Sequence, residues 1–61
     1  MVYENVKKMC DKKGITIAQL ERESGLPNGT IGKWRKFNPT AKSLQAVAKV
    51  LKTKMETLLQ E

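Results

Sequence analysis

The sequence has 61 residues, so we expect a single domain over residues 1–61 with a marginal core, because such a domain buries only about 60% of its unfolded surface. Its 12 Lys and Arg against 6 Asp and Glu give a formal net charge of +6, which attracts polyanions or simply keeps a protein in solution. With no His and one Cys, the chain lacks the residues for a disulfide framework, a zinc cluster or imidazole catalysis, so a binding protein without metal or cofactor is favoured over an enzyme.

Apolar residues spaced by three and four predict a first helix over residues 3–13. Val6 and Cys10 lie on its apolar stripe, so Cys10 is expected to be a small core residue without chemistry of its own. Gly14 is well placed to end this helix in a left-handed turn.

The second helix begins at a complete start signal. Thr16 and Gln19 have the spacing of a capping box, in which each side chain bonds the other residue's backbone N–H, and Ile15 can pack on Leu20 as a hydrophobic staple. We expect this helix to run to Ser24, with the glycine that follows as its stop.

Only residues 25–27 separate this helix from a third, which we expect over residues 28–36. At about 100° per residue, Ile31 and Trp34 point toward the core. The opposite arc holds no acid and consists of Asn28, Gly29, Gly32, Lys33 and Lys36. This outer face is therefore basic or without side chains.

Two further helices complete the prediction. Thr40 can cap a fourth helix, which has the clearest apolar stripe of the chain: Ala41, Leu44, Val47, Ala48 and Leu51. Thr53 and Glu56 have the spacing of another capping box, which would open a short fifth helix. Its inward-facing residues are expected to be Met55, Leu58 and Leu59. Since no segment alternates like a strand, we predict an all-α, five-helix domain.

The second and third helices, joined by a three-residue turn containing glycine, have the arrangement of a helix-turn-helix, whose second helix fits the major groove of DNA. The residues resemble the Cro and phage-repressor family of helix-turn-helix transcriptional regulators over most of the chain. The resemblance rests on Gly14-Ile15-Thr16, Leu20, Gly25-Leu26, Thr30-Ile31, Trp34, Pro39, Leu44, Ala48, Leu51 and Leu58-Leu59. It implies a lambda-repressor-like fold with the helix-turn-helix at helices 2 and 3.

The resemblance also implies where DNA is contacted. Base contacts would come from Asn28, Gly29, Gly32 and Lys33, with Asn28 suited to an adenine edge and Lys33 to guanine O6 and N7. Phosphate contacts would come from helix starts and the loop after helix 3, which here hold Thr16, Asn38, Thr40 and Lys42. Lys36, farther along helix 3, is also expected to meet a phosphate. Thr16 and Thr40 can equally be exposed caps without a DNA role.

The two glycines limit what this face can recognise. Each costs a helix about 1 kcal/mol relative to alanine, and close approach to DNA is one reason for their presence. Gly29 can instead belong to an Asn28-Gly29 turn. Since glycine offers no side-chain hydrogen bonds, we expect modest specificity that is helped by DNA shape.

The chain departs from the family at several positions. Ile17 stands where a glutamine often holds a phosphate, and Pro27 occupies the usual cap of helix 3, leaving that cap to Asn28 or to a phosphate. Glu21 replaces a small residue, and we hypothesise that it forms an ion pair with Arg35 between helices 2 and 3. The apolar Phe37 either covers the core or forms a dimer contact with Val50 or Met55.

These observations favour a sequence-specific DNA-binding regulator, phage-like, that represses as a homodimer on a pseudo-palindromic operator with half-sites about 34 Å apart. The chain would be a complete Cro-like protein or the N-terminal domain of a longer repressor. The alternative is a protein-interaction module, such as an antitoxin component, because fold alone does not fix function. Membrane binding is disfavoured because helix 3 has no free apolar face and no eighteen-residue apolar run exists. We therefore expect a cytoplasmic protein. No small-molecule substrate is evident from the sequence.

Overall fold

The computed structural model describes residues 1–60 and consists of helices and their connections. In chain order the helices are α1 (Val2–Lys13), α2 (Ile17–Glu23), the 3-10 helix η1 (Ile31–Arg35), α3 (Ala41–Leu51) and α4 (Met55–Leu59). Residues 1–60 contain no strand, which confirms the all-α class. The expected five α-helices are corrected to four, because the third element is a short 3-10 helix.

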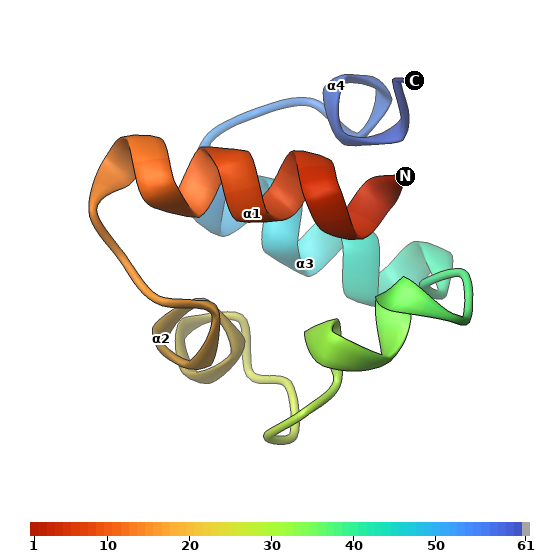
Figure 1. The fold of residues 1–61 in the computed structure, drawn as a ribbon, viewed down its shortest axis with the longest axis horizontal. Coiled ribbons are helices and arrows are strands. Elements are labelled where there is room, and N and C mark those ends of the chain that lie inside the picture. The colour runs from red at the N-terminus through yellow and green to blue at the C-terminus, as the bar shows by residue number, and fades with distance from the viewer. Residues whose placement is uncertain (61) are drawn as a thin grey trace.

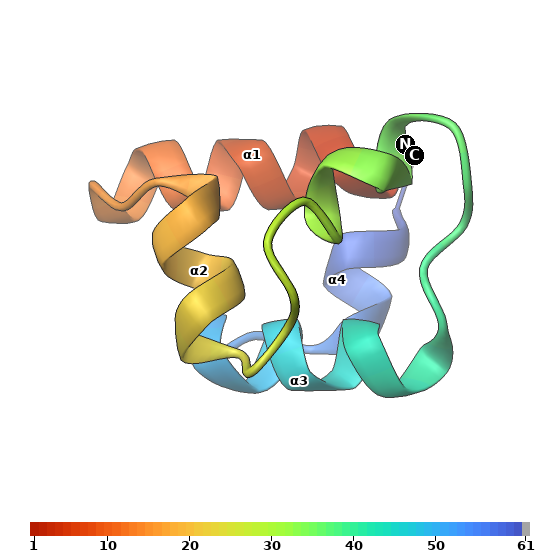
Figure 2. The same ribbon diagram turned by 90° about the horizontal axis from the view of Figure 1, so that it is seen from below.

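Helices α1 and α3 run in one direction, and α2 and α4 run across them, around a shared core (Figures 1 and 2). α1 and α3 run along opposite edges in Figure 2, with α2 near one end and α4 near the other. In Figure 1, η1 and the turn before it lie on the opposite side of the molecule from the α3–α4 connection. Within residues 1–60, no helix is both long enough and apolar enough to cross a bilayer.

The core receives side chains from every helix, which explains why so short a chain closes on itself. Its buried apolar members are Val6, Cys10, Leu20, Ile31, Trp34, Leu44, Val47, Ala48, Leu51 and Leu58. The predicted core positions Cys10, Ile31 and Trp34 are confirmed, because the helical spacing of apolar residues corresponds directly to the buried face. Leu59 is an exception, since 52% of it is exposed where it was expected to face inward.

Only one of the two hydrogen bonds of the capping box predicted at the start of α2 is present. Thr16 caps the helix and its Oγ1 accepts a hydrogen bond from the Gln19 backbone N at 3.0 Å. The Gln19 side chain does not return this contact, because its Nε2 donates to Glu23 Oε2 one turn along at 3.1 Å. Before the cap, Gly14 ends α1 in the predicted left-handed conformation, with φ 73°.

The predicted capping box at the start of the last helix is wrong. α4 begins one residue later than Thr53 would direct, with Lys54 as its cap and no side-chain hydrogen bond at that position. Thr53 instead donates its backbone N–H to Ala48 O at 3.0 Å, which completes the end of α3. The backbone N–H of Thr53 is therefore not available to the Glu56 side chain, which a capping box would require.

The two ends of the described chain are joined through Asn5 on α1. Its Nδ2 donates to Leu58 O at 2.8 Å and to Gln60 O at 2.6 Å. These carbonyls lie at the C-terminal end of α4, where backbone oxygens lack helical partners. One α1 side chain therefore anchors α4, and both termini lie at the same end of the molecule (Figure 2).

Candidate nucleic-acid interface

Residues 27–30 form a tight turn at the position where the third helix was expected to begin. Thr30 N donates to Pro27 O at 3.1 Å, and Gly29 has φ 93°, as in a type II turn. A residue with positive φ cannot continue a right-handed helix, so the predicted helix over residues 28–36 is shortened to η1. Gly29 thus lies in an Asn28-Gly29 turn, which was one of the two explanations offered for this glycine. Asn28 is exposed at the turn.

Glu21 of α2 fixes this turn. The residue is only 3% exposed, yet its Oε1 accepts from Gly29 N at 3.1 Å and its Oε2 accepts from Ile31 N at 2.8 Å. A carboxylate that accepts two amide hydrogen bonds is stably buried, because the charge-assisted bonds offset its desolvation. The backbone amides at the start of η1 are therefore bonded by Glu21 and not by the side chain of Asn28, which was expected to cap them.

The hypothesised ion pair between Glu21 and Arg35 is also wrong. Arg35 turns toward α1, where its Nη2 donates to the Tyr3 hydroxyl at 2.9 Å and its Cζ lies 4.6 Å from the centre of the Tyr3 ring. The premise that a buried acid at a helix crossing needs a partner was correct. The partners are backbone amides, which sequence spacing does not reveal.

The 3-10 geometry of η1 gives it three distinct faces, because residues three apart lie in line at about three residues per turn. Ile31 and Trp34 form the buried face. Lys33 and Lys36 form one exposed face, and Gly32 lies in line with Arg35 on another. The single outer arc predicted from an α-helical wheel is therefore divided into two adjoining exposed faces.

The stretch of sequence that contains the turn and η1 carries charge of one sign. Residues 24–55 contain no Asp or Glu at all. The same stretch carries seven of the chain's 12 basic residues: Lys33, Arg35, Lys36, Lys42, Lys49, Lys52 and Lys54. All seven are exposed, and none of them makes an ion pair with any described residue. Such an uncompensated field favours an anionic partner.

The predicted phosphate contacts divide into two groups. Thr16 is exposed at the start of α2, and its hydroxyl proton is free because the oxygen acts only as an acceptor. Asn38, Thr40 and Lys42 are exposed and follow one another from the η1–α3 loop into α3. Thr40 caps α3 by accepting from Ser43 N at 3.1 Å and already donates its hydroxyl to Ser43 Oγ at 2.9 Å.

Gly32 is not required by the fold. It has no positive φ, and a Cβ added to it would meet no atom within 4 Å. Packing inside the domain thus leaves room for a side chain at this exposed position of η1. A requirement for glycine here would have to come from something that approaches from outside.

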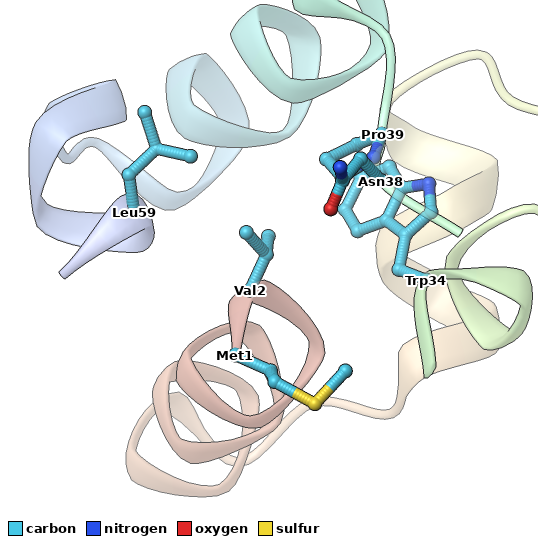
Figure 3. Close-up of a pocket in the computed structure, with 6 residues that line it drawn as sticks. All are labelled: Met1, Val2, Trp34, Asn38, Pro39 and Leu59. Atoms are coloured by element: carbon cyan, nitrogen blue, oxygen red, sulfur yellow. The ribbon is translucent and has the colours of Figure 1, made fainter. Parts of the chain in front are cut away.

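Phe37 does not cover the core, since 67% of it is exposed. Nearby, the start of α1, the end of η1 and α4 enclose an apolar hollow of about 230 Å³ (Figure 3). Its lining is Met1, Val2, Trp34, Asn38, Pro39 and Leu59, and it includes no acidic or basic side chain.

Comparison with known families agrees with this geometry. A family model described as the Cro/C1-type HTH DNA-binding domain matches residues 5–60, which include α2, the turn and η1. Comparisons with curated proteins and with solved structures find no match. Because the model spans nearly the whole sequence, the chain belongs to the Cro/C1-type helix-turn-helix family of DNA-binding domains.

Proposed function

We propose that this protein is a sequence-specific transcriptional repressor of the phage type, which reads the DNA major groove with η1 and the turn before it. The observation that carries the proposal is the division of η1 into a buried face of Ile31 and Trp34 and an exposed, acid-free face of Lys33 and Lys36. The buried face fixes the element to the domain, and the exposed face is available to the groove.

Base recognition is assigned to Asn28, Gly29, Gly32 and Lys33. Asn28 is exposed, and its side chain forms no hydrogen bond within the described residues, so it can bond an adenine edge through both polar atoms. Lys33 suits guanine O6 and N7, and each such contact discriminates by about 1–3 kcal/mol. The glycines let the backbone approach the base edges and contribute no side-chain contacts, which supports modest specificity.

Phosphate contacts are assigned to Lys36, Thr16, Asn38, Thr40 and Lys42. These contacts orient the domain without reading sequence. Thr16 can donate its free hydroxyl proton directly, whereas Thr40 must first give up its bond to Ser43. We therefore rank Thr16 above Thr40 as a side-chain contact.

Recognition of a pseudo-palindrome needs a second copy. The domain measures 24 × 21 × 17 Å, so a single copy is shorter than the roughly 34 Å between half-sites one helical turn apart. We propose a homodimer in which the exposed Phe37 takes part in the contact between copies. Val50 and Met55, both partly buried, remain the proposed counterparts.

The decisive experiment selects bound sequences from a random duplex pool at about 150 mM salt. Enrichment of a two-fold symmetric motif supports the proposal, and its spacing measures the half-site separation. Replacing Lys33 and Lys36 by Glu should abolish this enrichment. The matched control reverses Lys52 and Lys54, which changes the net charge equally on the far side of the molecule and should preserve binding.

The outcome that contradicts the proposal is also defined. If no sequence is enriched and binding falls only shallowly with salt, a protein-interaction module explains the fold better. If the two charge reversals weaken binding equally, the basic residues act through net charge alone and η1 has no special role.

A further inference from the structure

The guanidinium of Arg35 is held in one position on the outside of the molecule. Its Nη2 donates to the Tyr3 hydroxyl at 2.9 Å, and its Cζ lies 4.6 Å from the centre of the Tyr3 ring. Tyr3 is itself partly buried against the core, so it forms a fixed support. A cation stacked on an aromatic ring and hydrogen bonded at its edge loses its rotational freedom.

This held cation is not neutralised. Arg35 is exposed and forms no ion pair with any residue of 1–60. Glu4 is the acid that lines the same surface hollow of about 290 Å³, together with Met1, Tyr3 and Arg35. The Glu4 carboxylate lies 3.5 Å from the amino terminus, which compensates its charge. The remaining N–H groups of the guanidinium are free to bind an anion.

The position of Arg35 on η1 indicates which kind of anion it would bind. Arg35 lies on the exposed face that adjoins the Lys33 and Lys36 face, turned toward α1. An element inserted in the major groove has base edges in front of it and a phosphate strand on each side. Arg35 lies one turn farther along η1 than Gly32, which is assigned to the base edges, so its side chain is placed to meet a flanking phosphate strand where η1 leaves the groove.

We propose that Arg35 is a further DNA-phosphate contact of this domain and that Tyr3 is the residue that positions it. The inference rests on the proposed function and adds a contact from the α1 side of η1. Planar guanidinium groups match phosphate oxygens in a two-bond geometry. Because Tyr3 orders the side chain before DNA arrives, little freedom is lost on binding.

The test measures duplex affinity by fluorescence anisotropy on a labelled duplex of about 20 bp, at several salt concentrations. Each phosphate contact contributes about 0.9 to the slope of log affinity against log salt. Arg35→Gln should therefore reduce the slope by about 0.9 and weaken binding roughly 3- to 10-fold at about 150 mM salt. Lys54→Gln removes the same charge on the far side and should leave the slope unchanged.

Tyr3→Phe separates positioning from charge. It deletes only the hydroxyl, so the slope should stay the same because the cation remains, while affinity falls by roughly 2- to 5-fold through the added cost of ordering Arg35. Arg35→Lys should behave similarly, with the slope retained and affinity reduced. Circular dichroism in the same buffers confirms that each variant is folded.

The alternatives give different patterns. If Arg35→Gln and Tyr3→Phe lower the melting temperature and leave both slope and affinity as in the wild type, the pair only joins η1 to α1 and the inference is wrong. A steep slope for the wild type with no change in Arg35→Gln overturns this inference and leaves the proposed function intact. A wild type that binds no duplex overturns both.

Discussion

Replacing Glu21 by alanine tests the central structural feature of the helix-turn-helix. The change removes the acceptor of two amide hydrogen bonds, to Gly29 N at 3.1 Å and to Ile31 N at 2.8 Å. A buried amide left without a partner costs about 1–3 kcal/mol. Ile31 is fully buried and takes the full cost, whereas Gly29 is exposed and water can partly replace its bond.

The expected loss for Glu21→Ala is therefore about 2–4 kcal/mol. A domain of this length has only about 3–9 kcal/mol of unfolding free energy, so a large part of its stability disappears. Glu21→Gln keeps an acceptor oxygen but turns an NH₂ group toward the second amide, and should cost about 1–2 kcal/mol. The control is Glu23→Gln, which neutralises an exposed acid on the same helix and should shift stability by less than about 0.5 kcal/mol.

Urea unfolding followed by fluorescence measures these changes, because Trp34 is the chain's single tryptophan and is only 5% exposed. The reasoning fails if Glu21→Ala unfolds within about 0.5 kcal/mol of the Glu23→Gln control. In that case the turn would be held by its own geometry and the carboxylate would contribute nothing.

Three further predictions follow from single residues. Gly32→Ala should raise unfolding free energy by about 0.5–1 kcal/mol, because a Cβ there meets no atom, while lowering duplex affinity; a gain in both would show that DNA does not approach this position. Burial raises the pKa of the Cys10 thiol above its ordinary value of 9.0, so as the pH rises the thiol loses its proton in the unfolded chain before it does so in the folded one. The contribution of the buried neutral thiol to the free energy of unfolding is therefore complete below pH 9 and declines at higher pH. Unfolding free energies of the wild type and Cys10→Ala should thus converge at alkaline pH, and a constant difference would contradict the shift. Lys52 ends α3 at φ 57°, so Lys52→Gly should stabilise the domain by about 0.5–1 kcal/mol in a thermal melt, and a destabilised variant would show that no strain is stored there.

Much of this fold follows from local patterns in the sequence. Ile31, Trp34 and Cys10 are buried as predicted, because apolar residues at helical spacing must share one face whatever the details of packing. Gly14 adopts the expected left-handed turn, since few other residues tolerate that conformation. The family resemblance, which combined such local features, was confirmed over residues 5–60.

The errors have two physical origins: local patterns that fit more than one structure, and contacts between residues that are distant in the sequence. The spacing of Ile31 and Trp34 fits an α-helix and a 3-10 helix equally well, so periodicity could not show that η1 is short. Glu21 bonds amides eight and ten residues away, and Arg35 meets Tyr3 across 32 positions of sequence. Neither partner carries a sequence signal of its own.

The attachment of α4 through Asn5 has a consequence for how the protein is made. Two hydrogen bonds of the Asn5 amide reach Leu58 O and Gln60 O, more than fifty positions later in the chain. During synthesis α1 leaves the ribosome long before its partner residues are joined to the chain. The docking of α4 on α1 therefore has to wait until Leu58 and Gln60 have left the exit tunnel, whereas the contacts of α1 with α2 and η1 can form earlier.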